Sequence, residues 1–365
     1  MGSQSTRRNI LLPLVSTWTP VQAGRPQRAR PCRGLSLLVA LTQFLLARLA
    51  PRAVLMVALL AGLTLVPAPT AYAAVQACTE AGLDAALAAG LTNTFSCVGA
   101  TTITVSATKT VSVSGTVLDG GGLLTISGGG VQRVFIVDPG VTATFQNLTI
   151  ANGADATGGG GILNNGTLTI RNSTFSGNST TFFGGGILNG GTLTISNSTF
   201  SGNSAATLGG GIYQNGGTVT LKNTIVANST SGDNCSAAIA DGGNNLDSAN
   251  TCGFTVNAKI NTNPNLGALT GSPAYFPLNT GSAAIDAGDN AICAAAPVSN
   301  ASQNGVTRPV DGDSNGTATC DIGSYEAPAA DTTPVPTLSE WAMLLMGLLL
   351  VGLGLHQLRR RRLIA

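Results

Sequence analysis

The sequence predicts an all-β protein: a right-handed parallel β-helix with a short N-terminal capping helix and a C-terminal hydrophobic helix. Three observations predict it. First, segments beginning at Gly158, Gly184 and Gly209 nearly copy one another at a spacing of about 25 residues, and a fixed period of this length indicates a solenoid. Second, each copy contains a short run of alternating apolar and polar residues. Third, Gly and Asn separate these runs, which leaves no room for a helix in each repeat.

The repeats place equivalent residues at equivalent positions of successive coils. Gly-Thr-Leu-Thr-Ile at 166–170 alternates with a period of two, so Leu168 and Ile170 point into the core while Thr167 and Thr169 point outward. Coils of a parallel β-helix lie ~4.8 Å apart, so side chains in register stack. We expect the side-chain amides of four residues to form one hydrogen-bonded ladder, because Asn also tolerates the left-handed conformation of a sharp corner: Asn147, Asn172, Asn197 and Asn223.

The first coil needs a cap, because open strand edges promote aggregation. Residues 79–87 read as an amphipathic helix with Thr79 as N-cap and acidic residues in its first turn. This helix lies between Cys78 and Cys97, so a disulfide could hold it over the first coil. Early, less regular coils are expected at 101–105, 111–117, 123–126 and 134–137.

The domain boundaries follow from these patterns. We predict a leader with a signal peptide at 1–73, the N-terminal cap at 74–100, β-helix coils at 101–232, an irregular C-terminal part of the same domain at 233–327, a linker at 328–334 and a tail at 335–365.

The leader carries the three parts of an export signal. Basic residues Arg48 and Arg52 precede the apolar run 53–66, and Ala71-Tyr72-Ala73 provides a small-residue cleavage site, so we expect cleavage after Ala73. A retained transmembrane helix is the alternative, but the run is short for a ~20-residue span. Residues 1–34, with Arg7-Arg8, read either as a weak twin-arginine signal or as a start codon assigned too early.

The tail has three ordered parts. Val335-Pro336-Thr337-Leu338-Ser339-Glu340-Trp341 precedes an apolar run at 342–355 and the cluster Arg359, Arg360, Arg361 and Arg362. An apolar helix with an interfacial Trp and a cationic end indicates a membrane segment whose arginines stay cytoplasmic. An ordinary C-terminal anchor would read similarly.

This tail resembles the IPTL-CTERM sorting signal, a relative of PEP-CTERM tails. Val335 stands where Ile is usual, and Ala342 where Gly commonly follows Trp. The resemblance implies export in a Gram-negative bacterium, transient anchoring in the inner membrane, and processing by an exosortase, a membrane protease.

The cysteines agree with export. Cys32 lies in the leader, and an even number of six remains in the exported part, which indicates disulfides. Neighbours in sequence suggest the pairs Cys78–Cys97, Cys235–Cys252 and Cys293–Cys320, among fifteen possible connectivities. A zinc site is disfavoured because there is no C-x-x-C and the single His is His356.

The C-terminal part loses the 25-residue period but carries ordered markers: Gly281-Ser-Ala-Ala-Ile-Asp-Ala-Gly-Asp289, Arg308-Pro309, and Cys320-Asp-Ile-Gly-Ser-Tyr-Glu326. With the coils, they resemble the choice-of-anchor Q family of exported bacterial proteins; the coils also resemble the polymorphic outer-membrane repeat. The family resemblance implies a β-helix of the pectate-lyase type at the cell surface and no settled activity.

Charge excludes several classes of function. Between Ala74 and Pro334 there are six Lys/Arg and fifteen Asp/Glu, a net charge of about −9, so no nucleic-acid binding is expected. Charged residues are 9% of the chain, too few for a charged disordered protein. The mature part has no His before the tail, which excludes a Ser-His-Asp set.

One loop resembles the first half of a calcium loop. Asp311, Asp313 and Asn315 supply oxygen ligands at positions 1, 3 and 5, Gly316 follows at position 6, and Asp321 could substitute for the usual twelfth-position Glu. The alternative is a solvated turn. Any bound calcium would be structural, and no other cofactor is predicted.

No catalytic residue is assigned. The coils contain Arg133, Arg171 and Lys222 with Asp119, Asp138 and Asp155, and we expect no two of these charged residues to share a repeat register, which is unfavourable for a lyase or glycosidase site. What remains is outward-facing Thr, Ser and Asn, with Tyr213 as the one exposed aromatic residue.

The function predicted is therefore an exported cell-surface or matrix protein that is structural, adhesive or polysaccharide-binding. Its partners would be the secretion machinery, an exosortase, the inner membrane before processing, and extracellular polysaccharide. A polysaccharide lyase or glycosidase on the same scaffold, and a calcium-stabilised binding module, are the alternatives.

Overall fold

A computed structural model describes residues 73–271, 274–296, 298–329 and 338–362 of the chain. The predicted signal peptide, residues 1–34 and the tail residues Val335, Pro336 and Thr337 lie outside these ranges. The described chain is mostly β-structure, a parallel β-solenoid of about six turns. An apolar helix, α4 (Leu338–Arg362), lies in the tail.

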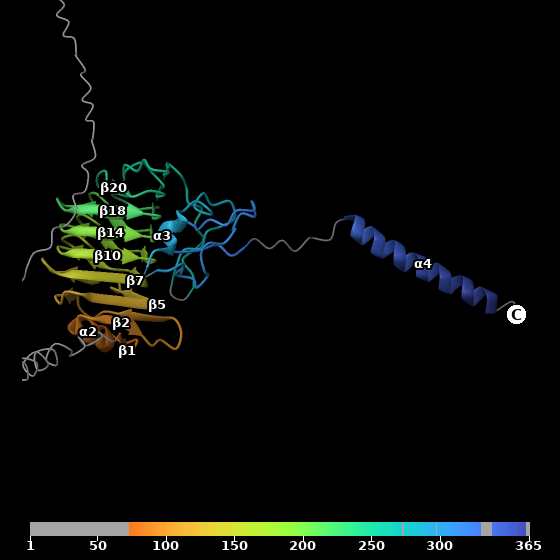
Figure 1. Cartoon of the computed structure of the whole chain (residues 1–365), viewed down its shortest axis with the longest axis horizontal. Helices are drawn as coiled ribbons and strands as arrows, with labels where there is room; N and C mark the ends of the chain where they lie inside the picture. The colour runs from red at the N-terminus through yellow and green to blue at the C-terminus, as the bar shows by residue number, and fades with distance from the viewer. Residues whose placement is uncertain (1–72, 272–273, 297, 330–337, 363–365) are drawn as a thin grey trace, which may run out of the picture. The chain divides into compact units, whose positions relative to one another are not determined.

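The strands form three parallel ladders (Figure 1). The 14-stranded sheet bends at an Asn corner into two faces, because the long strands β5 (Thr116–Ser127) and β7 (Thr142–Ala151) run through both. We call these faces A and B, and the five-stranded sheet face C. Face A contains β1 (Ala74–Gln76), β2 (Thr92–Phe95), the first halves of β5 and β7, β10 (Thr167–Arg171), β14 (Thr192–Ser196), β18 (Thr218–Lys222) and β20 (Ala240–Asp241).

The other ladders complete each coil. Face B contains β3 (Thr101–Thr104), the second halves of β5 and β7, β11 (Thr174–Ser176), β15 (Thr199–Ser201), β19 (Ile225–Ala227), β21 (Leu246–Asp247) and β22 (Lys259–Ile260). Face C contains β4 (Lys109–Val111), β6 (Phe135–Val137), β9 (Ile162–Asn164), β13 (Ile187–Asn189) and β17 (Ile212–Gln214). A short ladder of β8 (Ala154–Asp155), β12 (Ser179–Thr180) and β16 (Ser204–Ala205) joins faces B and C.

The core consists of apolar columns that follow the strand registers. Phe175 and Phe200 stack in parallel on face B with ring centroids 4.4 Å apart, and both are fully buried. Ile170 and Ile195 form the equivalent pair on face A. Each coil therefore buries its apolar side chains against the next coil, and stability accumulates through neighbouring coils.

The Asn corner between faces A and B has the residues that the repeat predicts. Asn147, Asn172, Asn197 and Asn223 have φ of 53, 48, 47 and 45°, the left-handed conformation. The side chain of Asn172 donates to Asn147 (2.7 Å) and that of Asn223 to Asn197 (3.1 Å). Between Asn172 and Asn197 the ladder is interrupted, because the Asn172 Oδ1 and Asn197 Nδ2 atoms have no hydrogen-bond partner among the residues that the structure describes.

Two further Asn ladders lie at the other corners. Asn164 Nδ2 donates to Asn189 Oδ1 (2.6 Å), and Asn178 Nδ2 donates to Asn203 Oδ1 (3.0 Å). All four residues are buried, so their amides satisfy backbone and side-chain groups that water cannot reach. Both pairs have the 25-residue spacing of the repeat, so the sequence already indicates these two ladders.

The N-terminal cap is helix α2 (Glu80–Ala89), and the predicted N-cap is confirmed: the Gly82 amide donates to Thr79 Oγ1 at 3.1 Å. The Cys78–Cys97 disulfide is also confirmed. Lys109 in β4 reaches Glu80 and Asp84, both at 2.7 Å. A covalent link and an ion-pair cluster therefore hold α2 to the first coils.

The solenoid continues beyond residue 232. Strands β20, β21 and β22 add parallel rungs up to Ile260, although the connections between them no longer have the repeat's length. The Cys235–Cys252 disulfide closes this region. In the early coils, β4 ends at Val111 and β5 begins at Thr116, so the run expected at 111–117 is divided between two strands.

The remaining C-terminal part, residues 263–271, 274–296 and 298–327, folds back over the outer side of face B. Outward-facing Thr149, Thr174 and Thr199 are buried beneath it. Thr149 donates to the Ala274 carbonyl (2.6 Å), and Thr174 donates to Gln303 Oε1 (2.6 Å). Helix α3 (Asn290–Ala294) lies beside the ends of the face A strands (Figure 1), where Asn223 bonds Asp289. The outward polar face predicted from the repeats is therefore covered on B and open on A.

Arg308 and the segment from Cys320 to Glu326 form one buried unit of the C-terminal part. Arg308 is 2% exposed and donates to the carbonyls of Asp321, Gly323 and Tyr325 at 2.9, 2.8 and 3.2 Å. Glu326 lies beside it, with its oxygens accepting from the Val310 and Asp321 amides. The Cys293–Cys320 disulfide, the third predicted pair, joins α3 to the same loop.

Candidate functional site

Face A presents a regular array of hydroxyl groups. Thr142, Thr167, Thr192 and Thr218 pair in register from β7 to β18, and all four are exposed. Thr144, Thr169, Thr194 and Thr220 form a second, half-buried column two residues along the strands. Rungs are ~4.8 Å apart and residues i and i+2 are ~6.8 Å apart on a strand, so eight hydroxyls lie on a nearly flat grid.

A third column follows the edge of this grid next to the Asn corner. Its members are Asp119, Gln146, Arg171, Ser196 and Lys222. The expectation that no two of these charged residues share a register is therefore wrong for Asp119, Arg171 and Lys222. The residues are 25 to 27 positions apart in the sequence. Gln146, Arg171, Ser196 and Lys222 each precede an Asn of the predicted ladder, so the alignment of those Asn residues already contained this correspondence.

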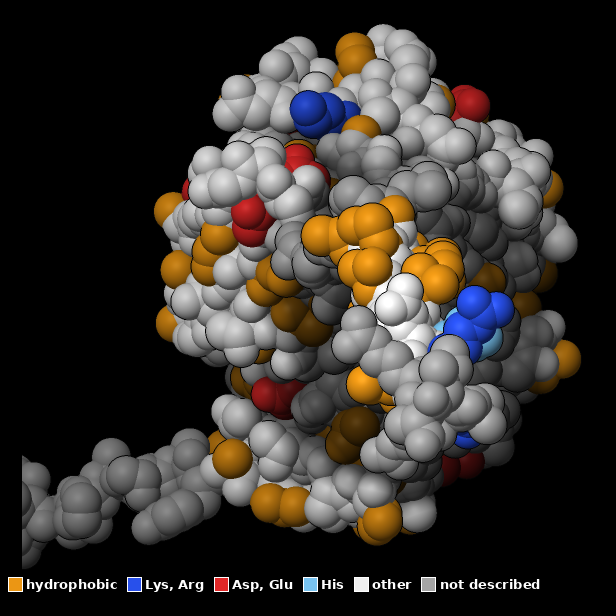
Figure 2. Space-filling view, turned by 90° about the vertical axis from the view of Figure 1, so that its right-hand side faces the viewer, with side chains coloured by type: hydrophobic (Ala, Val, Ile, Leu, Met, Phe, Trp, Pro, Cys, Tyr) orange, Lys and Arg blue, Asp and Glu red, His pale blue; other side chains and the backbone are white. Residues whose placement is uncertain are grey.

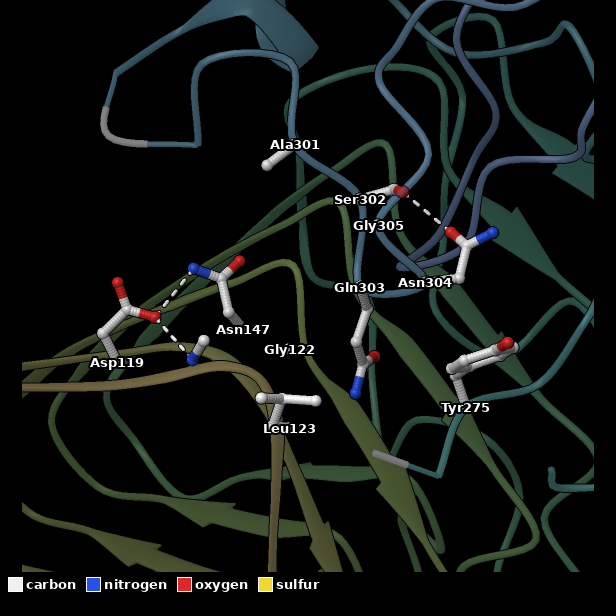
Figure 3. Close-up of a pocket in the computed structure, with 11 residues that line it drawn as sticks. Asp119, Gly122, Leu123, Asn147, Tyr275, Ala301, Ser302, Gln303, Asn304 and Gly305 are labelled. Atoms are coloured by element: carbon white, nitrogen blue, oxygen red, sulfur yellow. Dashed lines mark hydrogen bonds between the residues drawn. The ribbon is translucent and has the colours of Figure 1, made fainter. Parts of the chain in front are cut away.

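A cleft of about 500 Å³ lies beside the start of this column (Figure 3). The β5 side supplies Asp119, Gly122 and Leu123, and the Asn corner supplies Asn147. The C-terminal part supplies Tyr275 and the segment 301–305 on the opposite side. Sequence reasoning missed this cleft because its two sides are 128 to 186 residues apart in the sequence, and no repeat relates them.

The polar groups of the cleft are held firmly in place. Asp119 Oδ1 accepts from the Gly121 amide and from Asn147 Nδ2, both at 2.9 Å, and its Oδ2 accepts from Gln146 Nε2 at 2.9 Å. Gly121 and Gly122 have positive φ, so the turn that carries Asp119 favours glycine. Among the lining residues Asp119 is the single carboxylate, whereas glycoside hydrolysis ordinarily uses two. The cleft is better suited to binding than to hydrolysis.

The predicted calcium ligands are partly brought together. Asp311 and Asp313 join Asp286 in a group in which one carboxylate oxygen of each residue lies within 4.8 Å of the other two. Asn315 binds within the loop instead: its amide donates to Asp311 and Asp313, and its side chain donates to Asp313 Oδ2 at 3.0 Å. Asp286 was not anticipated, since it lies 25 residues before Asp311 and outside the loop.

Asp321 lies apart from this group. Its carboxylate accepts from the backbone amides of Asp286 and Ala327, and it is 1% exposed. Burial raises the pKa of Asp321 to about 7, and the nearby Glu326 charge adds to this effect. Burial also raises the pKa of Asp286, with a contribution from Asp313. Oxygen-only ligands of this kind suit a hard cation such as Ca²⁺, with Asp286 in the place expected for Asp321.

The tail supplies a segment long enough to cross a membrane. Trp341–Arg360, a 20-residue stretch of α4 with mean hydropathy 1.7, has no buried residues. Apolar side chains cover α4 and basic side chains gather near its end (Figure 2). At ~1.5 Å per residue this stretch extends about 30 Å, the thickness of a bilayer core. The run from Leu338 and Trp341 to Arg359 and Arg360 is thus one continuous helix.

Comparison with known proteins identifies the tail. Residues 333–362 match the IPTL-CTERM motif. This match indicates an exported protein that is anchored transiently by its C-terminal helix and processed by an exosortase. None of the curated proteins and none of the solved structures matches the chain.

Proposed function

We propose that this protein is a surface or matrix component of a Gram-negative bacterium that binds extracellular polysaccharide along face A. The observation that carries the proposal is the grid of eight Thr hydroxyls on an uncovered face. Residues 1–73 would direct export as a signal peptide, and the resemblance to the choice-of-anchor Q family agrees with a surface location.

The chemistry of the grid fits a hydroxylated polymer. Each Thr hydroxyl can donate one hydrogen bond and accept two, and sugar hydroxyls have the same capacity. An extended chain of sugar rings advances by roughly one rung of the solenoid per ring, because both repeats are about 5 Å. Single contacts of this kind are weak, at about 0.5–1.5 kcal/mol each, but a polymer makes many of them at once.

The neighbouring cleft would hold a sugar ring or a branch at the end of the grid. Tyr275 supplies an aromatic surface that packs against Tyr325 with ring centroids 5.4 Å apart. Asp119 and Asn147 supply polar atoms on the opposite side. An aromatic ring facing fixed polar groups is a common composition for a small-molecule site.

The Asp286–Asp311–Asp313 group would bind calcium in a structural role. Asp286 precedes α3, and the other two residues lie in the loop that follows Arg308 and Pro309. A cation there would link two segments of the C-terminal part that covers face B.

Removal of hydroxyls from face A tests the binding proposal. The double variant Thr169→Val/Thr194→Val keeps side-chain volume and strand propensity but removes two adjacent hydroxyls. Thr207→Val, at an exposed position outside face A, is the matched control. On an array of bacterial polysaccharides we expect the double variant to bind about tenfold more weakly and the control to bind like the unchanged protein. Equal binding by all three proteins would refute the proposal.

The same polymers also test the alternative of an enzyme. After incubation with uronic-acid polymers, a lyase would generate unsaturated products that absorb in the ultraviolet. A glycosidase would release reducing ends. Either product, lost on Asp119→Asn substitution, would favour catalysis in the cleft over binding alone.

A further inference from the structure

Three of the six basic residues in the acidic body are engaged in salt bridges. Lys109 pairs with Glu80 and Asp84, Arg133 pairs with Asp155, and buried Arg308 lies beside Glu326. Arg171, Lys222 and Lys259 form no salt bridge within the part of the chain that the structure describes. In a body of net charge about −9, cations without an acidic partner call for a separate explanation.

Two of these three cations lie in one column of face A. Arg171 pairs with Ser196, and Ser196 pairs with Lys222, so the two basic residues are two rungs apart on the same outward side. At ~4.8 Å per rung their backbones are about 10 Å apart. The half-buried Thr169, Thr194 and Thr220 lie two residues away on the same three strands.

Both side chains are held beside the grid by their surroundings. Arg171 Nη1 donates to the Ala296 carbonyl of the C-terminal part at 2.6 Å, while its Nε has no hydrogen-bond partner within the described part of the chain. The stem of Lys222 passes over Gly242, where an added Cβ would approach Lys222 Cγ to 2.4 Å. Restricting two long side chains before binding lowers the entropy that a ligand must overcome.

The acidic end of the column is separated from the cations. Asp119 is two rungs before Arg171, with Gln146 between them. Its carboxylate is held in place by Gly121, Gln146 and Asn147, and it forms no salt bridge with Arg171. The column thus presents two positive charges at a fixed spacing beside uncharged hydroxyls.

We infer that Arg171 and Lys222 form a paired anion site that selects an anionic polysaccharide, with acidic groups borne by alternate sugars contacting the two cations. The inference rests on the proposed function and names its ligand class. Because one sugar ring spans about one rung, acidic groups two rings apart match the Arg171–Lys222 spacing. Carboxylate and sulfate groups share this chemistry, and Arg and Lys bind both. The acidic body repels anions at long range, so recognition depends on these local contacts.

The test measures binding of the full chain in mild detergent to three polymers: polygalacturonate, dextran sulfate and uncharged dextran. Arg171→Gln and Lys222→Gln are compared singly and together, with Lys259→Gln as the control for loss of a positive charge outside face A. We expect about threefold weaker binding to polygalacturonate for each single variant and about tenfold for the double variant. Lys259→Gln and the unchanged protein should bind equally, and added salt should weaken binding by the unchanged protein more than binding by the double variant.

The outcomes separate this inference from the proposed function. Binding of polygalacturonate alone assigns the site to carboxylates, and equal loss of dextran sulfate binding in the double variant extends it to sulfates. If the double variant binds anionic polymers as well as the unchanged protein does, the paired site is refuted. If Thr169→Val/Thr194→Val still weakens binding in that case, face A remains the binding surface. If none of the variants changes binding, both proposals fail.

Discussion

Replacement of Arg308 by Ala should detach the C-terminal part from face B without unfolding the solenoid. Arg308 is fully buried and its guanidinium donates to three carbonyls in the loop 321–325. Its Nε lies 3.6 Å from Glu326 Oε2, too far for a hydrogen bond but close enough for strong attraction in a buried site. Truncation removes all of these contacts and leaves Glu326 as an unpaired buried charge.

The expected cost follows from these contacts. Hydrogen bonds from a charged donor contribute about 1.5–3 kcal/mol each, and breaking a buried ion pair by removing one partner costs about 3–5 kcal/mol. The two figures overlap because they count the same contacts, so we expect a loss of about 4 kcal/mol. For a body of this size that corresponds to a fall in Tm of about 10 °C.

Hydrogen exchange locates the loss. In Arg308→Ala, amides of residues 274–327 should exchange faster, together with Thr149, Thr174 and Thr199 beneath them, while the face C strands keep their protection. Lys259→Ala, at an exposed strand, should change Tm by less than about 1 °C. If Arg308→Ala leaves both Tm and exchange unchanged, the C-terminal part is held by other contacts and the reasoning is wrong.

Three further predictions concern acid, metal and the tail. Burial raises the pKa of Asp321 to about 7, whereas an unfolded Asp titrates at about 3.9, so the folded state retains a proton that the unfolded state releases. The free energy of unfolding should therefore fall as the pH rises from about 4 to about 7. In urea titrations, Asp321→Asn should show a weaker dependence of this free energy on pH. Saturating Ca²⁺ should raise Tm by about 5 °C in the unchanged protein and not in Asp286→Asn, with Asp233→Asn as control; the same shift in both variants would place the ion elsewhere. Deletion of residues 335–365 should change the fraction retained at the cell surface, measured by fractionation, and unchanged distribution would contradict processing through the tail.

The repeat made the solenoid predictable from sequence, because stacking depends on local properties. A residue such as Phe175 needs only its equivalent, Phe200, one coil later to be buried, and Asn172 adopts the same left-handed corner as Asn147 and Asn197. The cap was predictable for a similar reason, because its signals are local. Thr79 and the acids that follow it lie at the start of the helix, and Cys78 forms a disulfide with the nearby Cys97.

The C-terminal part could be recognised but not placed from sequence. Arg308 and Glu326 were visible as markers, yet nothing local indicates that they share one buried site with Asp321. The fold brings them together through contacts separated by up to 18 residues of irregular chain. The cleft was out of reach for the same reason, because Asn147 and Tyr275 meet only when the C-terminal part covers face B.

The charged column of face A was not predicted, although the alignment of the repeats already contained it. Asn172, Asn197 and Asn223 were aligned across the one-residue insertion, so the residue before each of them, Arg171, Ser196 and Lys222, was aligned as well. In a parallel solenoid, aligning one residue of a strand fixes the register of the whole strand. The covering of face B determines which of these aligned columns a ligand can reach. The Thr149–Thr199 column contacts the C-terminal part, whereas the columns of face A stay open. The polysaccharide that we propose would therefore contact face A and not the covered face B.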